Sequence, residues 1–216
     1  MNAPLRSDPA VGRRAMRHVE GVALVEFAEI YDESVELVSV SRPVSDTVDT
    51  ASQTLLRDAG LQAQWIQGGT GATGAPIGGR SHDCADALQA LHDAMEAPVE
   101  VLRELLECES CGVRVKVLDG PMCPRFHVDQ VPARMLITYA GPGTDWISHN
   151  DIDLRAMASR EPEPLRPGCT VRSLATGAWS LLKGGRWDSD YCGVLHRSPA
   201  GSGLRLLVSL DPIFSS

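Results

Sequence analysis

The spacing of apolar residues changes near residue 112, from a helical period to a strict alternation. Before that point, residues 44–61 and 81–107 repeat their apolar side chains along one helix face, and Pro98 is expected to break the second stretch into two helices. After it, short segments alternate apolar and polar residues, as half-buried strands do. The clearest of these segments are residues 113–117, 135–139, 178–182 and 204–210. The alternation predicts a β-sandwich or β-barrel in the second half of the chain.

This change in pattern, together with an N-terminal stretch that shows no periodicity, divides the 216-residue chain into three predicted parts. Residues 1–20 show no periodicity and are expected to form a flexible tail. Residues 21–112 are expected to form a mainly helical N-terminal part, with one short strand over residues 35–41. Residues 113–216 are expected to form the β core that carries the chemistry. The predicted fold class is therefore α+β, with a helical part packed on a β-barrel.

A glycine-rich stretch, residues 68–79, lies within the helical part. It contains a Gly-x-Gly-x-x-Gly sequence beginning at Gly69, which is the fingerprint of a dinucleotide-binding turn. That fingerprint requires a helix immediately after it, whereas Pro76 and Gly78 delay any helix. A flexible connector or a mobile lid is therefore the preferred interpretation.

Composition narrows the class of protein further. The formal net charge of −8 at pH 7 argues against a general nucleic-acid binder. No segment approaches the roughly 18 consecutive apolar residues of a membrane span. The N-terminal sequence has no apolar signal-peptide core, so a cytoplasmic location is expected. In such a compartment the six cysteines are expected to be thiols, metal ligands or small buried residues rather than disulfides.

The candidate chemistry lies in the β part, at His127, Asp129 and His196. The first two are two residues apart in the sequence Cys-Pro-Arg-Phe-His-Val-Asp, so a strand would point both side chains the same way. His196 lies on another predicted strand, and closure of a barrel would bring it to the other two. Two imidazoles and one carboxylate can hold one face of a divalent iron and leave positions for a 2-oxo acid and dioxygen. We predict that these three residues, called the triad below, bind a metal and form the catalytic centre.

Arg205 lies nine residues after His196, beyond a turn rich in Gly, Ser and Pro. The two residues are therefore expected on adjacent antiparallel strands that face one pocket. A guanidinium can bind a carboxylate through two parallel hydrogen bonds. Arg205 is thus the candidate for binding the distal carboxylate of 2-oxoglutarate.

The triad and Arg205 together resemble the Fe(II)/2-oxoglutarate-dependent dioxygenase superfamily, over roughly residues 113–213. The resemblance implies a double-stranded β-helix core, also called a jelly roll and similar to that of cupins. It also implies that the triad binds Fe(II) and that Arg205 binds 2-oxoglutarate. The superfamily often has Ser or a similar polar residue two positions after this Arg. Here that position holds Leu207, and Ser209 comes later.

Five short motifs are also similar to an uncharacterised bacterial domain family of unknown function. They are Cys-Pro-x-Phe-His-x-Asp (123–129), Tyr-Ala-Gly-Pro-Gly-Thr-Asp-Trp (139–146), Leu-Leu-Lys-Gly-Gly-x-Trp (181–187), His-Arg-Ser-Pro (196–199) and Arg-Leu-Leu-Val-Ser-Leu-Asp (205–211). Genes of that family are often found near zinc-homeostasis genes. This resemblance implies a metal-related role, with metal-homeostasis proteins as candidate partners, and names no reaction.

The cysteines offer a competing ligand set. Cys123 stands four residues before His127, and Cys192 stands four residues before His196. If both strands lined one pocket, two thiols and two imidazoles would form a tetrahedral zinc site. The alternative is that these cysteines pack as small apolar residues. We predict packing for Cys192 and leave Cys123 open as an additional ligand, because Pro124 is expected to bend the chain there.

Two further groups carry weaker signals. Cys108-x-x-Cys111, at the end of the helical part, is compatible with half of a zinc site, with a redox pair or with chance packing. Three tryptophans are compatible with pocket walls or with core packing. They are Trp146, Trp179 and Trp187.

The leading hypothesis is a mononuclear Fe(II)/2-oxoglutarate-dependent oxygenase that hydroxylates a small molecule or a protein. The first alternative is a non-enzymatic zinc-binding or metal-homeostasis protein that uses the same pocket. A third hypothesis is a metal-dependent hydrolase or a cupin-type isomerase, in which the metal activates water. The sequence names no substrate.

Overall fold

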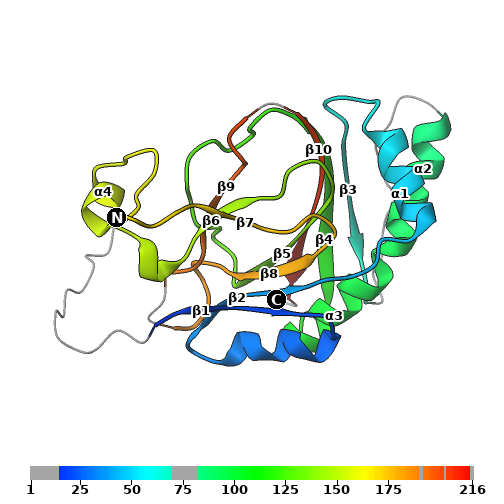
Figure 1. Cartoon of the computed structure of the whole chain (residues 1–216). Helices are drawn as coiled ribbons and strands as arrows, with labels where there is room; N and C mark the ends of the chain where they lie inside the picture. The colour runs from blue at the N-terminus through cyan, green and yellow to red at the C-terminus, as the bar shows by residue number, and fades with distance from the viewer. Residues whose placement is uncertain (1–14, 70–81, 190–191, 202, 215–216) are drawn as a thin grey trace.

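A computed structural model describes residues 15–69, 82–189, 192–201 and 203–214 of the chain, and two β-sheets dominate them (Figure 1). The large sheet consists of β1 (Arg17–Gly21), β2 (Val35–Val40), β3 (Gln62–Gln67), β4 (Ser110–Asp119), β5 (Ala133–Ala140), β8 (Trp179–Lys183) and β10 (Leu204–Ile213), in the order β1-β2-β8-β5-β10-β4-β3. The small sheet consists of β6 (Asp145–Ile147), β7 (Arg172–Ser173) and β9 (Leu195–Arg197), in the order β7-β6-β9. Neighbouring strands are antiparallel except β1 and β2, which are parallel.

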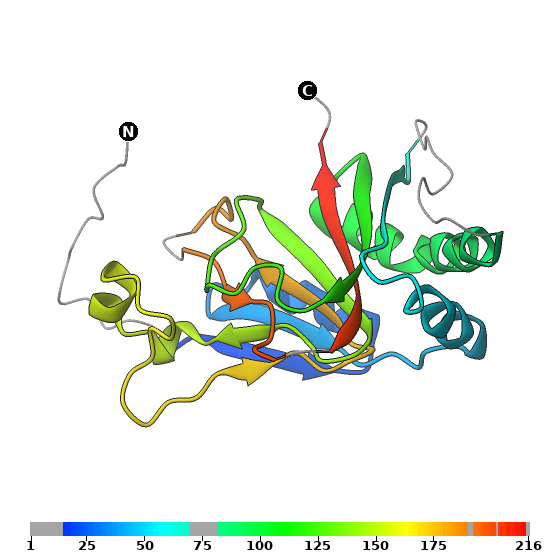
Figure 2. The same cartoon turned by 90° about the horizontal axis from the view of Figure 1, so that it is seen from above.

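Helices lie around these sheets. The described helices are η1 (Leu24–Tyr31), α1 (Asp46–Leu55), α2 (His82–Ala94), α3 (Glu96–Leu106), η2 (His149–Asp151) and α4 (Leu154–Ala158), where η marks a 3₁₀ helix. Figure 2 shows α1 and α2 side by side at one end of the molecule, and α4 at the other end. None of the described helices is both long and apolar enough to cross a membrane.

One face of the large sheet packs against the main core, and the other face lines the candidate site. On β4, Val113, Val115 and Val117 are buried in the main core, which they share with apolar residues of α1, α2 and α3. The alternating residues of the same strand, Arg114 and Lys116, line a pocket between the two sheets instead. This strand alternation therefore places the apolar core on one face and the pocket on the other.

The predicted strands of the β part are present, and the strand predicted at residues 35–41 is β2. The predicted tail is partly wrong, because residues 17–21 form β1 and pair with β2. The sequence analysis also missed β3, whose buried Ala63 and Trp65 alternate with exposed glutamines. Glutamine is not enriched in strands, which hides this short alternation. As a result, strands from both predicted parts join one sheet, and residue 112 does not separate a helical layer from a β layer.

Pro98 does not break the helical stretch, which corrects the prediction. The break falls at Met95, between α2 and α3, and Pro98 lies in the first turn of α3. Proline is tolerated there because the first backbone N–H groups of a helix have no intrahelical acceptor. Residues 70–79 of the glycine-rich stretch, including most of the fingerprint that begins at Gly69, lie outside the described residues.

Candidate metal centre

The two histidines of the triad are brought together by direct backbone pairing. The N–H of His127 donates to the carbonyl of His196, and the N–H of His196 donates back to the carbonyl of His127, each with an N···O distance of 3.0 Å. This is an isolated antiparallel bridge next to β9, so His127 does not lie in a longer strand as predicted. Residues directly opposite each other in such a pair project their side chains to the same side. The two imidazole centroids accordingly lie 4.6 Å apart.

Asp129 completes the cluster. Its Oδ2 lies 3.2 Å from Nε2 of His196, and its Oδ1 lies 3.9 Å from Nε2 of His127. All the candidate ligand atoms of the triad lie within 4.8 Å of one another. Two ligands at right angles on an ion, each at about 2.1 Å, would be about 3 Å apart. The structure therefore brings the three predicted residues close to the spacing that a single ion requires.

The loop that carries Asp129 is held by two glycines. The N–H of Gly185 donates to the carbonyl of Asp129 at 2.7 Å, and the N–H of Gly184 donates to the carbonyl of Pro132 at 2.8 Å. A Cβ at Gly184 would lie only 2.0 Å from the carbonyl oxygen of Val131. The Lys-Gly-Gly turn thus allows a close backbone approach that any larger residue would prevent.

Backbone carbonyls set the tautomer of both imidazoles. Nδ1 of His127 lies 3.0 Å from the carbonyl oxygen of Arg125, and Nδ1 of His196 lies 3.0 Å from that of Val194. A carbonyl only accepts, so each Nδ1 is the nitrogen that carries the proton. Each Nε2 is then the ring nitrogen left to bind a metal, as in metal-ligating histidines.

Asp129 stays ionised in this environment. Burial alone raises the pKa of its carboxyl group, but the neighbouring His196, Arg134 and His127 lower the pKa overall. Its Oδ2 is buried and receives no well-aligned hydrogen bond from any residue that the structure describes. An ionised oxygen without a well-aligned donor among the described residues, 3.2 Å from Nε2 of His196, fits a bound divalent cation. The nitrogen and oxygen donor set is one that suits Fe(II).

Arg134, which was not among the residues predicted from the sequence, connects the triad to β10. Its Nη1 lies 2.6 Å from Oδ1 of Asp129, and its Nε lies 2.6 Å from Oδ1 of Asp211. Arg114 contacts the other oxygen of Asp211, with Nη1 2.5 Å from Oδ2. Strand alternation could have indicated that both residues face the pocket, because Arg134 and Asp211 occupy pocket-side positions in β5 and β10. The pairing itself depends on a strand order that the sequence does not reveal.

Arg205 lies in the same pocket, although it is not on a strand adjacent to His196 as predicted. Its strand, β10, pairs with β4 and β5, whereas β9 pairs with β6 in the small sheet. The strands β9 and β10 belong to different sheets although only residues 198–203 separate them, so the two residues face the pocket from opposite sheets. The pocket has a volume of about 170 Å³ and is also lined by Thr144 and Ser209.

The guanidinium of Arg205 is buried and only partly paired. The residue is 2% exposed, and its Nη2 donates to Oγ1 of Thr144 at 2.9 Å. Its Nε and Nη1 have no acceptor among the described residues. Burial lowers the pKa of Arg205 to about 10, which still leaves it charged at neutral pH. Buried charges are normally paired, so two open donors on a buried cation indicate a site for an anionic ligand.

The cysteines do not form, with the triad histidines, the four-ligand zinc site that the sequence offered as an alternative to packing. Cys123 lines the pocket and is half-buried, but its sulfur is not among the described ligand atoms that cluster at the triad. Cys192 is exposed, so the prediction that it packs in apolar surroundings is wrong. Cys108 and Cys111 are buried in the main core, next to α3.

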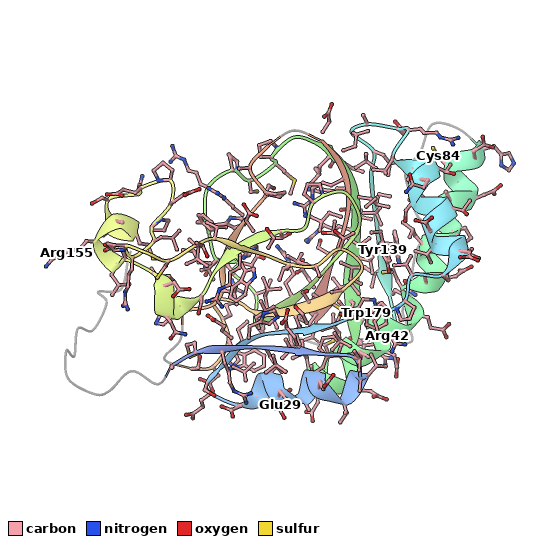
Figure 3. The ribbon with its side chains drawn as sticks, viewed as in Figure 1. Glu29, Arg42, Cys84, Tyr139, Arg155 and Trp179 are labelled. Carbon is pink, nitrogen blue, oxygen red and sulfur yellow. The ribbon has the colours of Figure 1, made fainter. Side chains whose placement is uncertain are left out.

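The tryptophans do not wall the pocket in the described structure. Trp146 is fully buried in a second apolar cluster, where its ring contacts His18 edge-on. Trp179 belongs to the main core, and Trp187 packs against that core. Figure 3 shows Trp179 close to Arg42, whose guanidinium lies 5.6 Å from the indole centroid. Core packing is therefore the better interpretation of these three residues.

Comparisons with known proteins agree with the family and the fold. A family model described as "Protein of unknown function (DUF1826)" matches residues 22–211, so the chain belongs to this family. No curated protein matches the sequence.

Several solved structures share the fold at low sequence identity. A full-length Neurospora crassa protein, in complex with alpha-KG and 5-formyluracil, has a TM-score of 0.53 and 9% identity, over 96% of this chain and 87% of that one. The rice dioxygenase for auxin oxidation has a TM-score of 0.54 and 10% identity, over 92% and 83%. JOX2, in complex with 2OG, Fe and JA, has a TM-score of 0.52 and 12% identity, over 100% and 80%. The fold is thus α+β with a jelly-roll core, as predicted.

Proposed function

We propose that this member of the DUF1826 family is a mononuclear Fe(II)- and 2-oxoglutarate-dependent oxygenase. One observation carries the proposal: the buried, partly unpaired Arg205 faces the same pocket as the His-Asp-His triad. In a protein that binds only a metal, a buried arginine with unpaired donors would lower the stability of the fold without binding any ligand. Proteins with the same fold support the proposal, since one is in complex with alpha-KG and another with 2OG and Fe.

Each residue has a defined task in this proposal. Nε2 of His127, Nε2 of His196 and Oδ2 of Asp129 would hold Fe(II). Arg205 and Thr144 would bind the distal carboxylate of 2-oxoglutarate, and the charge of Arg205 would also orient the diacid toward the metal. When bound, Fe(II) and 2-oxoglutarate supply oxidation by dioxygen, in which the diacid becomes succinate and CO₂ while a substrate C–H becomes C–OH.

The position of Cys123 in the pocket favours a second function, namely zinc binding. Because its side chain lines the pocket beside the triad, a thiolate there would make the site better suited to zinc. A non-enzymatic zinc-binding protein would then use the triad and Cys123. This alternative gives no role to Arg205, so we prefer the oxygenase.

Metal analysis and co-substrate titration of protein purified without oxygen separate the two functions. The oxygenase is expected to take up one Fe(II), and 2-oxoglutarate is expected to produce a visible charge-transfer absorption. Asp129→Ala should lose both, and Arg205→Met should retain the metal and lose the response to 2-oxoglutarate. The Cys123→Ala variant should bind Fe(II) as the wild type does. Tight zinc binding that requires Cys123, with no response to 2-oxoglutarate, would instead establish the second function.

A further inference from the structure

The pocket opens beside a part of the large sheet that carries polar side chains. Strand register places Gln62 opposite Lys116 and Gln64 opposite Arg114. Residues directly opposite each other lie on the same face of a sheet, so these four side chains form one surface, called the basic shelf below. Both glutamines are exposed, and the side chain of Arg114 is 44% exposed. In Figure 1, β3 and β4 lie on the far side of β10 from β8, toward α1 and α2.

The two cations of the basic shelf retain open donors. Arg114 uses Nη1 for Asp211, and no other described residue accepts from its guanidinium. Nζ of Lys116 lies 3.3 Å from the sulfur of Met122, and a thioether is a weak acceptor. No carboxylate of the described residues forms an ion pair with Lys116. This is unlike Arg134 and Arg197, which line the same pocket and do form ion pairs.

The charges around the pocket do not balance. Its lining carries five basic side chains, namely Arg114, Lys116, Arg134, Arg197 and Arg205. The carboxylates among the lining residues and their ion-pair partners are four, namely Asp129, Asp145, Glu163 and Asp211. One positive charge is left over, although the chain as a whole has a net charge of −8. A divalent metal and the doubly charged 2-oxoglutarate cancel each other, so the loaded site would keep this surplus.

We propose that the substrate oxidised in this pocket is a small organic anion, whose carboxylate or phosphate binds Lys116 and Arg114 on the basic shelf. The inference rests on the proposed function, because it concerns the second ligand of the same site. In the proposed function Arg205 binds the co-substrate, so Lys116 is the pocket-lining cation that has no ion-pair partner among the residues the structure describes. Charge-assisted hydrogen bonds from an ammonium and a guanidinium would fix the anion at the mouth of the pocket. The exposed glutamines would contact polar groups farther from the reacting carbon.

Calorimetry on the protein loaded with Mn(II) and 2-oxoglutarate tests this inference. The first titration measures 2-oxoglutarate itself, and its failure to bind would overturn the proposed function and this inference together. The second compares three probes on one aromatic ring: benzoate, phenyl phosphate and neutral benzamide. We expect at least one of the anions to bind roughly tenfold more tightly than benzamide. The better of the two identifies the group as a carboxylate or a phosphate. Equal affinities for all three would overturn the inference alone.

Variants locate the effect on the basic shelf. Lys116→Gln should reduce the preference for the anion several-fold, because only Arg114 then remains to bind it, whereas Lys116→Arg should keep the preference. Arg155→Gln is the matched control, because Arg155 projects from α4 at the edge of the molecule (Figure 3). The 2-oxoglutarate titration on each variant verifies that the pocket is intact. An unchanged preference in Lys116→Gln, or a loss in Arg155→Gln as large as in Lys116→Gln, would contradict the assignment.

Discussion

Arg134 donates to one oxygen of Asp129 and leaves the other oxygen for the metal pocket. Its Nη1 lies 2.6 Å from Oδ1, whereas Oδ2 is buried with no well-aligned donor among the residues described. The same guanidinium contacts both oxygens of Asp211, at 2.6 Å and 2.9 Å, which fixes it to β10. Arg134 is therefore a positioning residue that orients Asp129 as a ligand through one oxygen.

Removing this contact should weaken metal binding. In Arg134→Gln, Asp129 can rotate and Asp211 loses its main partner, so the affinity for Mn(II) should fall roughly 10- to 100-fold. Arg114→Gln is the matched control, because Arg114 contacts Asp211 and not Asp129, and its effect should be smaller. Calorimetric titration with Mn(II) measures both, and circular dichroism verifies the fold. A Mn(II) affinity in Arg134→Gln within twofold of the wild type would contradict the positioning role.

Arg205 should be necessary for co-substrate binding and unfavourable for stability. Its guanidinium is buried with two open donors, and its pKa is lowered to about 10, so it remains charged and costly at every pH below that value. Arg205→Met keeps an unbranched apolar stem and removes the charged guanidinium. The free energy of unfolding at pH 7 without ligand should therefore rise by about 1–3 kcal/mol. Urea denaturation measures this gain, and calorimetry should show that 2-oxoglutarate no longer binds. A variant that is less stable than the wild type would show that Arg205 is paired.

The turn behind Asp129 should not tolerate a methyl group. In Gly184→Ala the new Cβ would lie 2.0 Å from the carbonyl oxygen of Val131, so the backbone must move. We expect a loss of about 1–3 kcal/mol of stability, together with weaker Mn(II) binding. Gly112→Ala is the matched control, because its Cβ would meet its nearest neighbour at an ordinary 3.7 Å. Equal stability of the two variants in urea denaturation would show that the turn is not tightly packed.

Cys108 should titrate below the usual range of a thiol. The hydrogen bond from the Cys111 thiol is the main cause that lowers the pKa of Cys108, against the opposing effect of burial. The thiolate should therefore form at a lower pH than in an ordinary cysteine, which ultraviolet absorbance detects. In Cys111→Ala the donor is lost, so the titration should move to higher pH. The Cys108→Ala variant identifies the signal, and an unchanged midpoint in Cys111→Ala would exclude the hydrogen bond as its cause.

The sequence predicted which three residues lie together better than it predicted how they are brought together. His127, Asp129 and His196 could be named as candidate ligands because few residue types bind iron and because the spacing of the first two limits their directions. Their convergence through a direct backbone bridge was not foreseeable, since a single bridge has no alternating pattern around it. The prediction that Arg205 faces the pocket agrees with the structure, because the alternation of its strand places it opposite the core side chains.

The order of the strands, and the sheet to which each strand belongs, could not be predicted from the sequence. The turn between His196 and Arg205 looked like a hairpin, but Arg205 pairs with β4 and β5, which come earlier in the chain. The link from Arg134 to Asp211 likewise requires β5 and β10 to be neighbours. Local propensity specifies the strands, whereas their order is decided by which apolar faces pack together.

The most direct test of the central claim is a crystal structure of the protein grown without oxygen in the presence of Fe(II) and 2-oxoglutarate. We predict one ion bound by Nε2 of His127, Nε2 of His196 and Oδ2 of Asp129. We also predict that one carboxylate of the diacid lies on Arg205 and Thr144, with the 2-oxo acid end toward the ion. An ion bound elsewhere, or an Arg205 guanidinium that does not contact the diacid, would contradict the proposed oxygenase.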